Sequence, residues 1–159
     1  MEDKTNVMRL LDKKKIIYKS HYYGDTDAIS GVEVAEVLGQ NPECVFKTLV
    51  TVGKSKSYYV FVIPVAEELD LKMAAKAVGE KSIEMIKSKE LLPLTGYIHG
   101  GCSPIGMKKF FKTTIDESVL DCETFCVSAG KIGYQIELSL EELKKVIRID
   151  TAKLTVEVK

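Results

Sequence analysis

A lysine within an apolar, strand-like stretch is the first residue of this sequence that could do chemistry. Alternation along residues 45–52 places Lys47 on the side shared by Val45 and Leu49. Such a lysine either covers apolar surface with its stem at the rim of a sheet or uses its charge in a site. In a site it would be a fixed cation that holds a phosphate or a ribose-linked group, or that polarises a carbonyl.

The most glycine-dense stretch of the chain, residues 97–106, is the second candidate. Within it the residues that could face a ligand are consecutive: Gly100, Gly101, Cys102, Ser103 and Pro104. Backbone without a Cβ atom can approach a ligand closely, and its N–H groups can stabilise a developing oxyanion. The alternative is a plain turn at the end of a strand. The spacing does not match a Walker loop, and it is weak as a dinucleotide motif.

A nucleophile paired with a base is not evident in the sequence. Cys102 follows His99 by three positions, but a reactive thiol needs a base within hydrogen-bond reach and a lowered pKa. The alternative for Cys102 is a small buried thiol that packs the loop. Ser103 and Ser128 lack a recognisable triad partner. His21 and His99 are more typical of structural histidines than of bases.

Two further stretches could line a site. Residues 127–133 crowd small side chains into one connection between strands, which fits either the floor of a pocket or a hairpin turn. Lys108 and Lys109 precede two phenylalanines and Lys112. This mixture of basic and aromatic character suits an RNA-facing rim, because lysines meet phosphates and aromatic rings stack on bases. A solvated edge with two core phenylalanines is the alternative.

Length and composition exclude several classes of protein. The 159 residues, 45% of them hydrophobic and 29% charged, are typical of one globular domain and not of a disordered chain, a collagen or a coiled coil. Lys plus Arg and Asp plus Glu both number 23. This balance argues against binding to nucleic acid through global charge, but it leaves room for a local basic patch.

The cysteines and the apolar runs bear on cofactors and localisation. The four cysteines form no CxxC pair and only two histidines accompany them, so we expect no metal and no cofactor. The sequence shows no signal-peptide core and no apolar run of the roughly 18 residues that a membrane span needs. We therefore expect a cytoplasmic protein, with no membrane partner, whose thiols are reduced.

The elements that position the candidate residues mix strands and helices without a regular βαβ alternation. Strands are predicted at residues 16–18, 45–52, 58–65, 113–116, 123–127, 134–138 and 154–158. Helices are predicted after the capping residues Thr5, Ser30, Asp70 and Ser139, and at residues 82–92 before Pro93. The pattern favours a single domain over residues 1–159 with an α+β (mixed α/β) fold. Its sheet is expected to be mixed and mostly antiparallel, or a partly closed barrel, with surrounding helices.

Four motifs, taken together, resemble a known family. They occur in one order as residues 45–49, 71–79, 95–109 and 127–138. This arrangement closely resembles the YbaK/EbsC family of free-standing aminoacyl-tRNA deacylases, which is related to the editing domain inserted in bacterial prolyl-tRNA synthetases. The resemblance covers almost the whole chain, from Thr5 to about Val146.

The resemblance implies a trans-editing enzyme that removes cysteine wrongly attached to tRNA(Pro). Cysteine and proline differ by about one methylene, which is worth only about 1–3 kcal/mol of discrimination, so a second hydrolytic site is reasonable. The implied partners are mischarged tRNA and prolyl-tRNA synthetase, in a transient ternary complex. An alanine-specific deacylase of the same fold, and a non-catalytic module that binds tRNA or a synthetase, remain as alternatives.

Site residues can be carried over from the family by position. Lys47 corresponds to the family's essential lysine. Residues 100–104 match its GxxxP loop, whose Gly101 amide is expected near the scissile carbonyl. The other expected contacts with the substrate are Tyr23, Gly100, Cys102, Ser103, Pro104, Ser128 and Gly130, and the residues expected to bind tRNA are Lys108, Lys109 and Lys131.

One position departs from the family pattern. Gln135 stands where some members carry Asp, and an amide cannot act as a carboxylate base. This agrees with the mechanism proposed for the family, in which the thiol of the substrate cysteine attacks its own ester. Such a reaction needs positioning and oxyanion stabilisation rather than acid–base residues.

Overall fold

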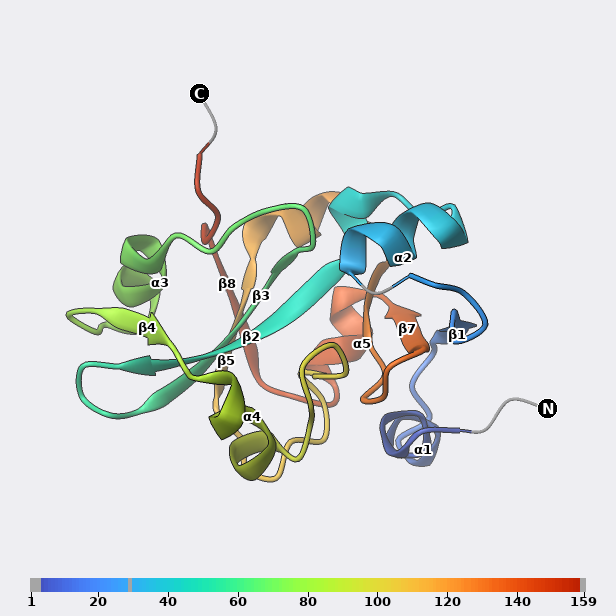
Figure 1. The fold of residues 1–159 in the computed structure, drawn as a ribbon, viewed down its shortest axis with the longest axis horizontal. Helices are drawn as coiled ribbons and strands as arrows, with labels where there is room; N and C mark the ends of the chain where they lie inside the picture. Colours follow the sequence, from blue (N-terminus) through green and yellow to red (C-terminus); the bar gives the residue numbers. More distant parts are fainter. Residues whose placement is uncertain (1–3, 29, 158–159) are drawn as a thin grey trace.

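Two sheets form the centre of the molecule in the computed structural model, which describes residues 4–28 and 30–157 (Figure 1). The three-stranded sheet has the order β1 (Lys19–Tyr22), β7 (Tyr134–Leu138), β6 (Phe125–Ser128). The five-stranded sheet has the order β4 (Ile83–Met85), β2 (Phe46–Gly53), β3 (Tyr58–Pro64), β5 (Lys112–Asp116), β8 (Ile149–Ala152).

The strand directions agree with the sheet expected from the sequence. Of the six pairings between the described strands, β3–β5 and β5–β8 are parallel and the other four are antiparallel. An isolated bridge between Val45 and Cys126 joins the start of β2 to β6. The two sheets therefore meet at this bridge, and the predicted α+β fold with a mixed, mostly antiparallel sheet is confirmed.

Five α-helices lie around the sheets in the described residues (Figure 1). They are α1 (Asn6–Lys13), α2 (Gly31–Leu38), α3 (Leu71–Val78), α4 (Ser88–Thr95) and α5 (Leu140–Lys144). The predicted capping residues of α1, α2, α3 and α5 each accept a hydrogen bond from a backbone N–H of the first turn. Two 3₁₀ helices complete the set, η1 (Pro42–Cys44) and η2 (Glu117–Asp121).

Three predicted elements differ in the structure. The strand predicted at residues 16–18 lies further along, as β1. Residues 82–92 divide into the edge strand β4, which pairs with β2, and the helix α4. Helix α4 continues through Pro93, whose nitrogen cannot donate an intrahelical hydrogen bond, and ends before its C-cap Gly96, whose φ is +85°. The last described strand is β8. Of the strand predicted at residues 154–158, the described residues 154–157 form only an isolated bridge, between Thr155 and Leu69, and residue 158 lies outside the described residues. The N–H of Leu154 donates to Asp116 Oδ1 at 2.8 Å.

The cysteines correct one expectation. A disulfide joins Cys44 to Cys122 and thereby links η1 to η2 across 78 residues of sequence, whereas the sequence predicted four reduced thiols. The other two cysteines, Cys102 and Cys126, are free and buried. No helix in the described part of the chain is long and apolar enough to cross a membrane.

Candidate functional site

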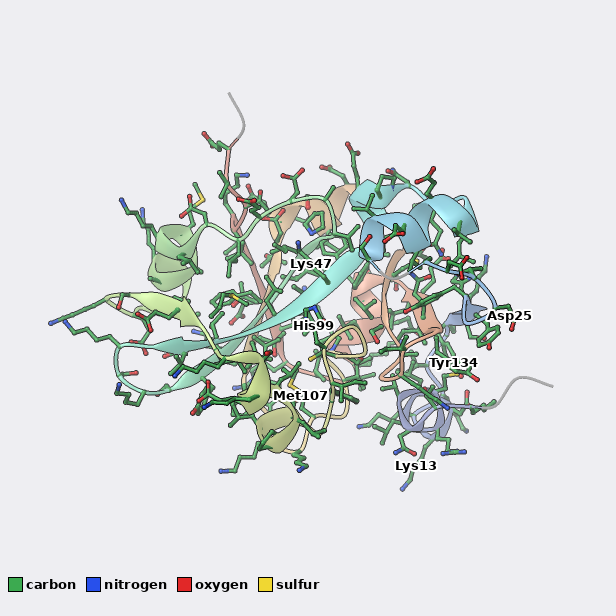
Figure 2. All side chains as sticks on the ribbon, viewed as in Figure 1. Lys13, Asp25, Lys47, His99, Met107 and Tyr134 are labelled. Atoms are coloured by element: carbon green, nitrogen blue, oxygen red, sulfur yellow. A yellow bond between two sulfur atoms is a disulfide. The ribbon has the colours of Figure 1, made fainter. Side chains whose placement is uncertain are left out.

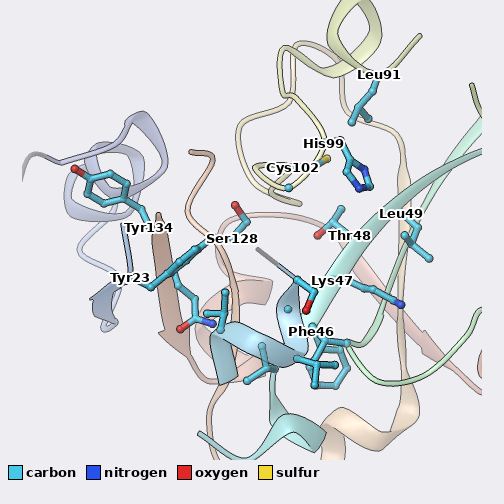
Figure 3. Close-up of a pocket in the computed structure, with 18 residues that line it drawn as sticks. Tyr23, Phe46, Lys47, Thr48, Leu49, Leu91, His99, Cys102, Ser128 and Tyr134 are labelled. Carbon is cyan, nitrogen blue, oxygen red and sulfur yellow. The ribbon is translucent and has the colours of Figure 1, made fainter. Parts of the chain in front are cut away.

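A cavity of about 380 Å³ opens where the two sheets face each other, and we call it the central cavity. It is lined by Tyr23, Ser30, Gly31, Val32, Val34, Val45, Phe46, Lys47, Thr48, Leu49, Val65, Leu91, His99, Gly100, Cys102, Ser128, Tyr134 and Gln135. Lys47 and His99 lie near the middle of the molecule (Figure 2). Strand β2 carries Lys47 and Thr48 on one side of the cavity, Tyr23 and Ser128 lie on the other, and His99 and Cys102 approach from the loop between them (Figure 3).

Lys47 lies on β2 directly opposite Ile63 of β3, and its side chain is half-buried. Burial lowers the pKa of the Lys47 ammonium, while the negative charges of Glu68 and Glu67 partly oppose that shift. Among the described residues no carboxylate lies close enough to form an ion pair with Lys47. Its charge is therefore incompletely hydrated and available to a ligand, which favours a site over a lysine that merely covers apolar surface.

Thr48, the next residue of β2, was not singled out in the sequence. Its side chain lines the central cavity, and its Oγ1 is out of solvent with no hydrogen-bond partner in the described structure. A buried hydroxyl without a partner costs about 1–3 kcal/mol, so such a group is retained where something else compensates for it. No local pattern marked Thr48 as a site residue, because alternation turns it to the opposite side of β2 from Lys47.

The glycine loop borders the cavity, but with a different residue than expected. Gly100, with φ of +88°, lines the cavity. The N–H of Gly101 instead donates to the carbonyl of Ile98 at 3.0 Å, and a Cβ at Gly101 would lie 3.2 Å from the backbone N of Ile132. Gly101 therefore supports the turn and its close approach to residues 131–132, so its amide is not free to face a carbonyl. In the described chain, the N–H groups of Gly100 and Cys102 have no backbone partner.

The other predicted residues of the glycine loop, Cys102, Ser103 and Pro104, are buried. Ser103 is fully buried, and its Oγ accepts a hydrogen bond from the N–H of Ile105. Pro104 is buried beside it, and neither residue lines the central cavity. Cys102 does line it, but burial raises the pKa of its thiol to about 12. Cys102 therefore stays a protonated thiol at neutral pH, which does not suit a nucleophile.

The far wall of the cavity comes from the three-stranded sheet and the segment after β1. Tyr23 is 8% exposed, and its N–H donates to the carbonyl of Gly133 at 2.8 Å. The Oγ of Ser128 accepts a hydrogen bond from the N–H of Gly130. Gln135 is buried and exchanges two side-chain hydrogen bonds with Gln40, at 2.7 and 3.3 Å. A carboxamide is not basic enough to act as a general base, and this one is instead paired with Gln40.

The residues expected to bind tRNA do not line the central cavity. Lys108 and Lys131 line a second hollow, together with Gly130, which was expected to line the substrate site. Lys109 is exposed and borders neither space. The structure thus brings Lys47, Gly100, Cys102, Tyr23 and Ser128 together around the central cavity, and the other predicted site residues do not line it.

Among the described residues, one group of potential metal ligands lies close together: His21, Cys126 and Glu137, whose donor atoms are within 4.8 Å of one another. They come from three adjacent strands, β1, β6 and β7, and so the sequence offered no spacing that would group them. Nε2 of His21 lies 2.8 Å from Oε1 of Glu137, whose other oxygen accepts from Thr124. The group is therefore already a hydrogen-bonded network.

Comparison with known proteins identifies the family. Residues 26–146 match the aminoacyl-tRNA editing domain, and the chain belongs to that family. It is 46% identical over 155 residues to EbsC of Enterococcus faecalis, provisionally named a Cys-tRNA(Pro)/Cys-tRNA(Cys) deacylase, and the match covers 97% of this chain and 94% of EbsC. The resemblance seen in the sequence is thus confirmed.

Two crystal structures share the fold. A hypothetical protein superposes with a TM-score of 0.86 at 20% identity, covering 96% of this chain and all of the other. A protein provisionally described as a trans-editing enzyme for prolyl-tRNA synthetase superposes with a TM-score of 0.82 at 22% identity, covering 98% of this chain and all of its own. At these identities the likeness concerns the fold alone.

Proposed function

We propose that this protein is a trans-editing deacylase that removes cysteine mischarged on tRNA(Pro). The family membership makes an aminoacyl ester of tRNA the expected substrate, and the 46% identical relative is named for cysteinyl esters. The observation that carries the proposal is the central cavity. A half-buried lysine and a glycine-containing loop both line this mostly apolar cavity, and among the described residues no ionised nucleophile lines it with them.

The reaction proceeds by attack of the substrate's own thiol. Its sulfur forms a bond to the ester carbonyl carbon, and the bond from that carbon to the ribose oxygen breaks. The thiol proton passes to the departing ribose oxygen, and cysteine leaves as a cyclic thiolactone that water then hydrolyses. The protein needs only to hold the thiol near the carbonyl and to stabilise the negative charge that develops on the carbonyl oxygen.

The residues of the cavity supply these two requirements. The ammonium of Lys47 holds the ribose or ester region, and the N–H groups of Gly100 and Cys102 stabilise the oxyanion, in the role expected of Gly101. In support, both residues line the cavity and neither N–H has a backbone partner in the described chain. Tyr23 and Ser128 bound the space for a small side chain on the opposite wall. Because the walls are mostly apolar, alanine also fits, and an alanine-specific deacylase is the second candidate.

Hydrolysis of four purified substrates tests the proposal: Cys-tRNA(Pro), Cys-tRNA(Cys), Ala-tRNA(Pro) and Ser-tRNA(Pro). We expect rapid loss of both cysteinyl esters, and slow loss of the seryl ester, whose hydroxyl is a weaker nucleophile than a thiol. Comparable rates on the alanyl ester contradict thiol assistance and favour the second candidate. Binding of tRNA without hydrolysis of any ester supports the non-catalytic module instead.

We further propose that the enzyme works in the cytoplasm, in a transient complex with prolyl-tRNA synthetase and tRNA. The chain has zero net charge, which limits the affinity for tRNA that global charge alone could supply. The synthetase would then supply the identity of the tRNA. Adding the synthetase should increase the ratio of cleavage of Cys-tRNA(Pro) to Cys-tRNA(Cys), and an unchanged ratio argues against the complex.

A further inference from the structure

The second hollow, of about 430 Å³, is lined by cationic side chains, and we call it the basic hollow. Arg9 comes from α1, Lys108 from the loop after α4, and Lys131 from the connection between β6 and β7. The other residues that line it are uncharged, so no described carboxylate offsets these three charges within the hollow. Helix α1, which forms one wall, lies below β7 in Figure 1.

The three cations are available to a ligand. In the described structure none of them takes part in an ion pair. Arg9 donates one hydrogen bond to Asn6 Oδ1 at 3.0 Å, and the Lys131 ammonium lies 5.4 Å from the centre of the Tyr134 ring. The carboxylate of α1, Asp12, is held instead by Lys4 and by the hydroxyl of Tyr18.

The charge of the hollow is local and not a property of the whole surface. A third hollow, at the η1–η2 end of the molecule, is lined by Glu43, Glu67, Asp116, Glu117, Asp121 and Glu157 with one lysine. The net charge of zero therefore results from basic and acidic regions that cancel each other. A polyanion that approaches this protein is attracted to the basic hollow and repelled from the acidic one, which orients it before contact.

The basic hollow adjoins the central cavity through two shared segments of chain. Tyr97 lines the hollow and His99 lines the cavity, so their Cα atoms are at most about 7 Å apart. Ala129 and Gly130 line the hollow, and the adjacent Ser128 lines the cavity. A nucleotide chain whose 3′ end lies in the central cavity thus needs to extend only a short way to bring a backbone phosphate into the hollow.

We propose that the basic hollow binds a backbone phosphate of the single-stranded acceptor end of the tRNA, through Arg9, Lys108 and Lys131. This inference rests on the proposed function and extends it, because it separates the residues that hold the phosphate from those that act on the ester. It also divides the lysines predicted from the sequence, since Lys108 and Lys131 bind and Lys109 does not. Phosphate contacts position a nucleic acid without reading its bases, so the hollow accepts any tRNA.

The test compares two substrates that differ in phosphates: cysteinyl-tRNA(Pro), and 3′-O-cysteinyl-adenosine, which has no phosphodiester. The triple variant Arg9→Gln/Lys108→Met/Lys131→Met removes the charges of the hollow and keeps much of the side-chain length. Its matched control is Lys13→Met/Lys109→Met/Lys112→Met, which removes the same net charge from exposed lysines that do not line the hollow. Thermal unfolding of both variants shows whether each remains folded.

We expect the hollow variant to raise KM for cysteinyl-tRNA about tenfold, since each exposed ion pair contributes about two- to threefold. Its kcat/KM on cysteinyl-adenosine should stay within twofold of the wild type. The slope of log KM against log salt should fall by about 0.7 for each phosphate that the variant no longer neutralises, and the control variant should keep the wild-type slope.

Two outcomes of these kinetic measurements overturn the inference. Equal effects of the two triple variants mean that only the overall charge matters, and equal losses on both substrates mean that the residues support the cavity rather than a phosphate. Wild-type protein that cleaves neither ester refutes the proposed function. In that case fluorescence anisotropy of labelled, uncharged tRNA still tests the hollow: weaker binding by the hollow variant alone supports it, and equal binding by both variants overturns it.

Discussion

The central cavity and the basic hollow are neighbours that share two loops, yet their linings differ in kind. The cavity has mostly apolar walls, one half-buried cation and one hydroxyl that lacks a partner. The hollow has three exposed cations and no described carboxylate. Groups that are held out of water can act strongly on a developing charge, whereas exposed charges contribute modest and salt-sensitive affinity. The difference therefore separates a place for chemistry from a place for binding.

The largest expected effect comes from Lys47→Met. Removing one preorganised cation from the cavity should lower kcat/KM by about 10²–10³-fold, and by the same factor on cysteinyl-tRNA and on cysteinyl-adenosine. The free energy of unfolding should stay the same or rise by up to about 1 kcal/mol, because a partly desolvated charge is removed. Steady-state kinetics and urea unfolding measure the two effects. Full activity in this variant would remove Lys47 from the mechanism and end the distinction between the two spaces.

Gly130→Ala tests the connection between the two spaces. Gly130 has φ of +93°, and a Cβ there would lie 3.0 Å from both Tyr97 Cε1 and Val7 Cγ2. We expect a loss of stability of about 2 kcal/mol, with a higher KM for tRNA as the walls of the hollow shift.

Gly39→Ala is the matched control, because Gly39 has φ of +67° but open space around its Cβ position. That variant should lose only about 1 kcal/mol, for backbone strain alone. Urea unfolding separates the two contributions. If both variants lose the same free energy of unfolding, the loop beside Tyr97 moves to accommodate the added Cβ without cost. In that case the basic hollow is not a preformed site.

A smaller effect is expected from Thr48→Val. If the Thr48 hydroxyl bonds to the substrate, its removal should reduce kcat/KM about fivefold. Stability should be unchanged or slightly higher, because a buried hydroxyl without a partner disappears. Thr114→Val is the control, since Thr114 Oγ1 on β5 is also buried and unpaired but lies outside the cavity lining. Activity that is equal in the two variants assigns the Thr48 hydroxyl to the structure and not to the substrate.

The sequence predicted the elements of this site better than the contacts within it. The alternation of residues 45–52 and the capping residues are local signals, so β2 and the starts of α1, α2, α3 and α5 were predictable. The motifs of the family brought Lys47 and the glycine loop into one hypothesis, and both border the same cavity.

The remaining features depend on the approach of distant segments, which no local pattern encodes. The hydrogen bond from Gly101 to Ile98 arises within one turn, but it is fixed by packing against residues 131–132. The pairing of Cys44 with Cys122 needs η1 and η2 to meet. The participation of Arg9 in the basic hollow requires α1 to lie beside residues 129–131, more than a hundred positions away.

The smallest expected effect is a pH dependence confined to the sheet behind the central cavity. Hydrogen bonds from Thr124 and from His21 lower the pKa of the Glu137 carboxyl below its ordinary value of 4.5. Since the folded-state pKa is the lower one, this carboxylate adds stability above the unfolded-state pKa and loses it as the pH falls through the folded-state pKa. The side chain is only partly buried, so the contribution is well under 1 kcal/mol.

Glu137→Gln should therefore make acid unfolding less steep below about pH 4.5, whereas Glu84→Gln, at an exposed position on β4, should not. Identical acid profiles for wild type and Glu137→Gln would show that the network of β1, β6 and β7 does not support this wall of the cavity.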